Sequence, residues 1–323
     1  MKNLTRKMIT AGMAATMAAS LGIAANAEEA TYKVGICQLI QHEALDAATQ
    51  GFQDALTEKL GDRVEFDVQN ASGESVNCST IINGFVSDQV GLILANATGA
   101  LQAAVAGTSD IPILGTAVTD YATALDIDDW TGTVGGNVSG TSDCAPLDQQ
   151  AAMILELVPE AKTVGMLYCS AEPNSEYQVN VVTEALKELN PDLEIKNYTF
   201  ADSNDISSVA TSATECDVVY IPTDNTAANN TEAINNVMEP AGVPVIAGEA
   251  GICQGCGIAT LSISYYDLGY TTGEMAYEIL EEGADISTME VQYAPNVTKQ
   301  YMADRCEKLG ITVPDDYEAI EAE

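Results

Sequence analysis

Positive charge is scarce in this sequence. The 323 residues include 12 Lys and Arg against 48 Asp and Glu, which gives a formal net charge of −36 at pH 7. Proteins that bind nucleic acid or anionic lipid surfaces carry the opposite balance, because they neutralise phosphate groups with Lys and Arg. We therefore expect neither class of partner.

Histidine is almost absent, since His42 is the only one. A histidine-based metal site or a Ser–His relay would depend entirely on this residue, so a loop histidine that makes a hydrogen bond is the simpler interpretation. The sequence also has no G-x-S-x-G segment, no P-loop and no G-x-G-x-x-G after its first apolar run. These absences predict a protein that is not an enzyme and has no cofactor and no metal.

Long apolar runs are absent after residue 27. Residues 1–27 have the parts of a secretory signal peptide: the cations Lys2, Arg6 and Lys7, a mostly apolar segment, and Ala25-Asn26-Ala27 at the cleavage position. An uncleaved anchor is the alternative, but Thr, Gly and Ser interrupt the apolar segment. Cleavage leaves 9 Lys and Arg against 48 Asp and Glu, a balance of −39. We expect a soluble protein in the periplasm or otherwise outside the cytoplasm.

Eight cysteines lie in the mature part, an even number that permits disulfides in an exported protein. Cys37 with Cys78 is the preferred pair, because one ends the first predicted strand and the other opens the second predicted helix. Cys253 with Cys256 is the second choice. The Cys253-Gln254-Gly255-Cys256 segment also leaves open a redox pair or half of a zinc site.

Short apolar runs rich in β-branched residues alternate with longer amphipathic stretches, which predicts an α/β fold with doubly wound parallel sheets. The predicted strands are Tyr32–Cys37, Val64–Val68, Gly91–Ala95 and Ile111–Gly115 in the first half, and Thr163–Tyr168, Leu193–Tyr198, Asp217–Ile221 and Val243–Ala247 in the second. A further strand at 258–263 and a helix at 267–280 follow.

The two halves repeat one pattern. Val34-Gly35 matches Val164-Gly165, and Ile111-Pro112-Ile113 matches Val243-Pro244-Val245, at offsets of 130 and 132 residues. A repeat of this length predicts two Rossmann-like lobes of one topology. We expect lobe 1 at 28–140 plus about 264–285 and lobe 2 at 141–263 plus about 286–323. A chain that crosses between the lobes more than once forms a hinge. This hinge predicts a ligand cleft between the lobes that closes on a small molecule.

The loops after the predicted strands are the expected ligand site, because parallel sheets bind ligands at the carboxyl ends of their strands. These loops contain hydroxyls, amides, carboxylates and His42, and no Lys or Arg. Helix N-termini and hydroxyls would hold one carboxylate of a ligand, and an acidic side chain would hold an ammonium. The loops therefore predict a zwitterionic amino acid as the ligand. Its side chain would lie beside Tyr121, Tyr168 or Tyr265. Helix capping is the alternative role for each acid.

The sequence resembles ABC-transporter substrate-binding proteins of the tryptophan or aromatic amino-acid type over nearly the whole mature chain. The segments that carry this resemblance are Val34-Gly35-Ile36 with Gln38 and His42, Gln69-Asn70-Ala71, Thr116-Ala117-Val118-Thr119-Asp120, Gly140-Thr141-Ser142-Asp143, Pro222-Thr223-Asp224-Asn225 and Tyr265-Tyr266-Asp267-Leu268-Gly269.

The resemblance implies a type I periplasmic-binding-protein fold with three crossovers, delivery of a ligand to a membrane permease, and no catalysis. It implies that an amino acid binds between the lobes of a monomer. The ligand-binding candidates are Thr98, Thr116, Asp120, Ser175, Asp224, Asn225 and Glu249, with Gln38, His42 and Tyr168. Cys169, Glu172-Pro173 and Cys253 to Cys256 depart from the family pattern.

Two other functions remain open. An extracytoplasmic sensor would use the same closure to signal to a receptor, and a pull-down would separate it from a transport protein. An exported thiol oxidoreductase would need a reactive, exposed cysteine. Titration of thiols in the native protein would identify such a residue.

Overall fold

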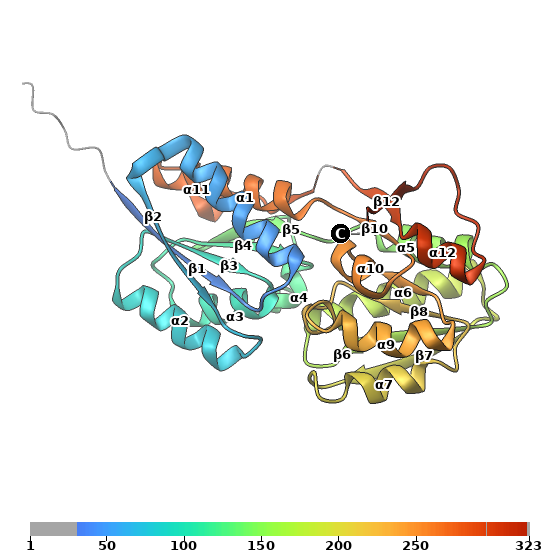
Figure 1. Ribbon diagram of the computed structural model, residues 1–323. Helices are drawn as coiled ribbons and strands as arrows, with labels where there is room; N and C mark the ends of the chain where they lie inside the picture. Colours follow the sequence, from blue (N-terminus) through green and yellow to red (C-terminus); the bar gives the residue numbers. More distant parts are fainter. Residues whose placement is uncertain (1–30, 295, 322–323) are drawn as a thin grey trace, which may run out of the picture. The chain divides into compact units, whose positions relative to one another are not determined.

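We describe residues 31–294 and 296–321 of a computed structural model, in which the strands form two parallel-rich sheets (Figure 1). The predicted signal peptide lies outside the described residues. The α/β class predicted from the sequence is confirmed, and each predicted strand and the helix at 267–280 is found with small shifts at its ends.

The first sheet has the order β11-β5-β4-β3-β1-β2, and its strands are all parallel. We call this sheet and its helices lobe 1. Its strands are β1 (Tyr32–Gln38), β2 (Val64–Asn70), β3 (Leu92–Asn96), β4 (Ile113–Val118), β5 (Val138–Ser142) and β11 (Gln292–Tyr293), and its helices are α1 (Glu43–Leu60), α2 (Ser75–Ser87), α3 (Thr98–Gly107), α4 (Tyr121–Leu125) and α11 (Tyr265–Leu280), with 3-10 turns at Gly61–Arg63 and Ile286–Thr288.

The second sheet has the order β13-β12-β10-β9-β8-β6-β7. We call this sheet and its helices lobe 2. Its strands are β6 (Thr163–Cys169), β7 (Glu194–Phe200), β8 (Val218–Ile221), β9 (Val245–Ala247), β10 (Ala259–Ser262), β12 (Thr298–Tyr301) and β13 (Glu318–Ala319), and its helices are α5 (Leu147–Leu157), α6 (Pro173–Leu189), α7 (Ile206–Ala213), α8 (Asn225–Ala228), α9 (Thr231–Ala241), α10 (Ala250–Cys256) and α12 (Ala303–Leu309).

The repeat seen in the sequence is a repeat of topology. The order β2-β1-β3-β4-β5 in lobe 1 corresponds to β7-β6-β8-β9-β10 in lobe 2. The chain passes between the lobes after β5, after β10 and after β11. Because β11 pairs with β5, the last passage comes after Tyr293, later than the boundary near 285 expected from the sequence.

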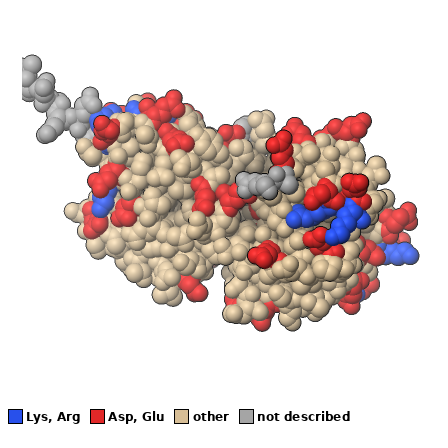
Figure 2. Space-filling view, viewed as in Figure 1, with Lys and Arg blue, Asp and Glu red and all other residues tan. Residues whose placement is uncertain are grey.

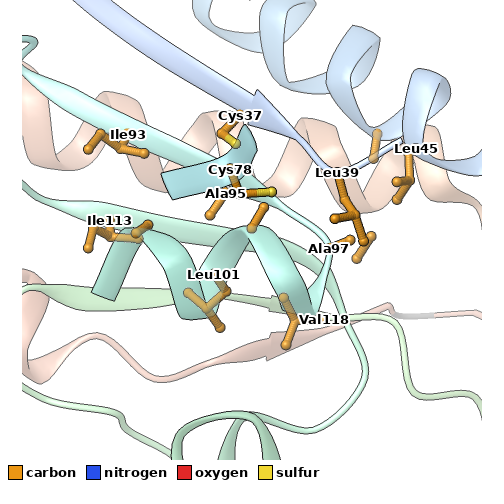
Figure 3. Packing of buried hydrophobic residues seen from close by; sticks show 14 of the residues in the cluster. Cys37, Leu39, Leu45, Cys78, Ile93, Ala95, Ala97, Leu101, Ile113 and Val118 are labelled. Atoms are coloured by element: carbon orange, nitrogen blue, oxygen red, sulfur yellow. The ribbon is translucent and has the colours of Figure 1, made fainter. Parts of the chain in front are cut away.

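Apolar side chains from strands and covering helices fill each lobe. In lobe 1, Ile93 and Ile113 of the sheet and Leu101 of α3 belong to one buried cluster (Figure 3). These strands read as continuous apolar runs because helices cover both faces of the sheet. Helices α1 and α11 lie side by side over the sheet (Figure 1), so the helix that follows the second passage is part of the lobe 1 core.

Candidate functional site

A cavity of about 440 Å³ lies between the two lobes. The loops that follow β1, β2 and β3 line it from lobe 1, and the loops that follow β6, β7 and β8 line it from lobe 2. We call it the interlobe cavity. The carboxyl ends of parallel strands build it, as the topology predicted.

The lobe 1 wall is partly apolar. Leu39 and Ile40 line the cavity after β1, and the 75% exposed Val76 lines it at the start of α2. Beside them, Gly99 brings the first turn of α3 to the cavity. The first amide groups of any helix lack a hydrogen-bond partner within the helix, and in α3 no side chain caps them. Unpaired N–H groups at the positive end of a helix dipole suit a carboxylate.

The backbone before α3 is strained. Ala97 has φ 87° and ψ 158°, a conformation that almost only glycine adopts, and Ala117, the next-to-last residue of β4, has φ 51°. Both alanines are buried at the carboxyl ends of adjacent strands, and the Ala97 N–H donates to Thr116 O at 3.0 Å. Strain of this kind concentrates at functional sites.

The lobe 2 wall is polar and acidic. Glu172 lines the cavity, and both of its carboxylate oxygens are occupied. Its Oε2 accepts from the Asn225 backbone N–H at 3.0 Å and from Asn225 Nδ2 at 2.7 Å, and its Oε1 accepts from the Thr226 N–H at 2.9 Å and Oγ1 at 2.7 Å. These donors hold the carboxylate in one orientation at the cavity wall.

The lobes contact each other beside this cavity. His42 Nε2 lies 3.2 Å from Asn225 Oδ1, and Asn229 Nδ2 donates to Gln41 O at 2.5 Å. Burial lowers the pKa of His42, which favours the neutral imidazole. Behind the contact lies a second space of about 360 Å³, lined by Glu43 and Glu249 among others. The His42 contact therefore separates two spaces between the lobes.

Three acids predicted as ligand contacts are helix caps. Asp120 accepts from Thr123 N at 2.7 Å, Asp224 accepts from Ala227 N at 2.7 Å, and Glu249 accepts from the N–H groups of Gly251 and Ile252. Asp224 also accepts from Cys169 N and Ser175 Oγ. Capping, the alternative left open by the sequence, describes their contacts in this structure.

Several other candidates belong to internal networks. Thr116 joins Thr141 and Thr272 in a buried cluster of hydroxyls. Gln38 accepts from Thr49 Oγ1 at 2.7 Å and donates to Asp46 Oδ1 at 2.6 Å. Asn225 and the first turn of α3, which begins at Thr98, are the candidates at the interlobe cavity, and His42 lies beside it.

None of the three predicted tyrosines lines the interlobe cavity. Tyr121 is buried and donates to Thr141 O, Tyr265 donates to Asp143 Oδ2, and Tyr168 is buried on β6. The apolar part of the cavity lining comes from aliphatic residues such as Leu39 and Ile40.

Asp143 is a buried residue that sequence reasoning did not single out. It follows β5 at the first passage between the lobes, and its Oδ1 is buried without a hydrogen-bond partner among the described residues. Burial raises the pKa of this carboxyl. In the sequence, the only indication of a role for Asp143 was its place in Gly140-Thr141-Ser142-Asp143, a segment that is equally typical of a linker.

The cysteine predictions are not met in the structure. All eight cysteines are free thiols, so the Cys37–Cys78 and Cys253–Cys256 disulfides are absent. Cys37 and Cys78 do contact each other in the lobe 1 core (Figure 3), and the contact with burial raises the pKa of Cys37. Cys253 and Cys256 are buried in α10, where the sequence predicted a loop, and burial raises the pKa of both thiols. Buried neutral thiols do not suit a redox pair.

Within residues 31–294 and 296–321, no helix has the length and apolar character to cross a bilayer. In the same residues, no group of three or more His, Cys, Asp or Glu side chains is arranged to bind a metal ion.

Comparison with known proteins identifies the family. The sequence model for ABC transporter substrate-binding proteins matches residues 33–322. The chain belongs to this family. It is 37% identical over 252 residues to a tyrosine-binding protein of Clostridioides difficile, covering 77% of this chain and 72% of that protein.

Two solved structures are also similar. An ABC domain from Streptococcus pneumoniae in complex with L-Trp has a TM-score of 0.85 and 29% identity, covering 90% of this chain and all of that one. A ligand-free, open substrate-binding protein with adhesive properties from Clostridium difficile has a TM-score of 0.69 and 33% identity, covering 91% of this chain and all of that one. The fold is that of the type I periplasmic binding proteins.

Stability should depend on pH through Glu249. Burial raises its pKa to about 7, above the ordinary value near 4.5, so the folded chain binds a proton that the unfolded chain releases. The free energy of unfolding should therefore rise as the pH falls from 8 to 6, with Glu249 contributing about 1 kcal/mol. Urea titrations at both pH values measure this.

The matched variant is Glu249→Gln, whose amide oxygen can still accept from the helix N–H groups. Its stability should change less between pH 8 and pH 6 than that of the parent. An equal pH dependence in both proteins would show that Glu249 is not the source.

Proposed function

We propose that this protein binds an aromatic L-amino acid in the interlobe cavity and delivers it to an ABC permease outside the cytoplasm. The observation that carries the proposal is the cavity itself, because loops of both lobes line it and its lining combines aliphatic side chains, an uncapped helix N-terminus and the fixed carboxylate of Glu172. Its described lining includes no Lys or Arg. The relatives that bind tyrosine and L-Trp support the ligand class.

Each part of a zwitterionic ligand has a counterpart in this cavity. The α-carboxylate would accept from the first amides of α3 near Gly99, and the ammonium would face the Glu172 carboxylate. The side chain would pack against Leu39 and Ile40. Burial of an aromatic ring there supplies the apolar part of the affinity.

The lobes would act as two rigid bodies that close on the ligand, with the passages after β5, β10 and β11 as the hinge. The chain has the higher TM-score with the L-Trp complex, although its identity is higher with the open, ligand-free protein. The contacts of His42 with Asn225 and of Asn229 with Gln41 would lock the closed state. We propose that the mature protein acts as a monomer after removal of residues 1–27.

Aromatic L-amino acids should stabilise and compact the protein. At a hundredfold excess over Kd, ligand binding to the folded state adds about 2.7 kcal/mol to the free energy of unfolding. Calorimetry, thermal melting and small-angle scattering with L-tyrosine and L-tryptophan test this. Phosphate, citrate and a neutral sugar are the controls. Binding of a control without response to any amino acid would refute the proposal.

A further inference from the structure

The charged side chains of the interlobe cavity have one sign. Glu74, Glu172 and Asp202 line it, and its described lining includes no cation. Glu74 and Asp202 are exposed at the cavity, whereas Glu172 is half-buried and held by Asn225 and Thr226. Acidic side chains scattered over the visible surface (Figure 2) add to the same field.

The basic residues after residue 27 lie outside the lining of this cavity. Lys33, Lys59, Arg63, Lys196, Lys299 and Lys308 form ion pairs with acids outside the cavity. Arg305 donates to backbone carbonyls at the end of α10, and Lys187 donates to Leu193 O. None of these residues, nor Lys162, lines the cavity. A ligand's own ammonium would be the cation that approaches the cavity carboxylates.

The two ends of a bound amino acid are therefore recognised unequally. The three carboxylates of the lining attract the ammonium through their negative potential, although the oxygens of Glu172 already accept from Asn225 and Thr226. The α-carboxylate has only the amide groups and dipole of α3, and it must enter the negative field of the neighbouring acids. Removing the ligand's carboxylate loses the hydrogen bonds to α3 but also removes this repulsion. Removing the ammonium leaves a ligand whose only charge has the same sign as the acids that line the cavity.

We propose that the interlobe cavity also binds aromatic primary amines that lack the α-carboxylate, so that the ligand class extends from aromatic amino acids to the corresponding arylethylamines. This inference rests on the proposed function, because it places the amine in the same cavity with the same apolar contacts. The ammonium is the obligatory group and the carboxylate is dispensable.

Calorimetry with three matched probes tests the proposal: L-tyrosine, tyramine, which lacks the carboxylate, and 3-(4-hydroxyphenyl)propanoate, which lacks the ammonium. We expect tyramine to bind within about tenfold of L-tyrosine and the propanoate to bind at least about a hundredfold more weakly. The reverse order, with the propanoate tighter than tyramine, would overturn the proposal. The tryptophan, tryptamine and indole-3-propanoate series provides a repeat in case the cavity prefers the larger ring.

A variant pair links the effect to the cavity. Glu74→Gln removes one charge at the cavity from a residue whose side chain does not cap α2. We expect it to weaken tyramine binding about fivefold and L-tyrosine binding less. Glu188→Gln, at an exposed position of α6 that does not line the cavity, is the matched control and should change neither. Equal effects of the two variants on tyramine would contradict the proposal.

The outcomes separate the inference from the proposed function. If neither L-tyrosine nor L-tryptophan binds, the proposed function fails. If either amino acid binds and its amine does not, the proposed function stands and the extension to amines is wrong.

Discussion

Replacing Gly269 with alanine should lower the free energy of unfolding by about 4 kcal/mol. A Cβ atom at this position would lie 1.9 Å from Ala48 O and 2.6 Å from the Ala48 carbonyl carbon. These are backbone atoms of α1, which cannot move aside as a side chain could, so α1 and α11 would have to separate. On the facing helix, a Cβ atom at Gly51 would lie 2.1 Å from Tyr266 O. Urea denaturation of the ligand-free protein measures the loss.

The matched control is Gly84→Ala on α2. Gly84 is exposed and helical, and no atom lies within 4 Å of the added Cβ. Alanine is the better helix former there by about 0.5 to 1 kcal/mol, so this variant should be slightly more stable than the parent. A Gly269→Ala protein as stable as Gly84→Ala would show that the two helices do not need their close approach.

Replacing Arg305 with alanine should cost about 3 kcal/mol of folding free energy, because polar groups at the end of a helix would lose their partners. Arg305 Nη1 donates to Cys253 O, Gln254 O and Gly257 O at 2.8 to 3.0 Å, and Nη2 donates to Gly255 O at 2.9 Å. The guanidinium of this single α12 residue thus donates hydrogen bonds to the backbone carbonyls at the end of α10.

Arg305→Lys is the informative companion, because an ammonium cannot reproduce the planar fork of donors and should recover only part of the loss. Lys33→Ala is the control, since it removes a surface ion pair with Asp88 that contributes about 0 to 1 kcal/mol. Urea denaturation of all three variants gives the comparison. Equal losses from Arg305→Ala and Lys33→Ala would refute the role assigned to Arg305.

Periodicity determined most of the architecture. Each strand predicted from the sequence is present. The central strands are apolar along their length because helices cover both faces of the sheet, whereas the edge strands β2 and β7 alternate between apolar and polar residues. The offsets of 130 and 132 residues between the halves correspond to two sheets with one strand order. The predicted loops contain no Lys or Arg, and neither does the described lining of the interlobe cavity. The two agree because the topology alone brings the loops at the carboxyl ends of parallel strands together.

Side-chain roles depended on the tertiary structure. Asp120, Asp224 and Glu249 are equally suited to cap a helix or to bind an ammonium, and only the tertiary structure showed that each caps the helix that follows it. Their contact with a ligand stays a prediction. Nor did the sequence indicate whether the predicted tyrosines would line the interlobe cavity.

The sequence by itself therefore determined the fold class, the repeat and the sign of charge around the ligand site, because these follow from local patterns and composition. Only the tertiary structure decided which residues line the interlobe cavity, that Asp143 is a buried carboxyl between the lobes, and that Arg305 serves α10. Each of these depends on contacts between segments far apart in the chain, and such contacts follow from packing and desolvation, which no local pattern records.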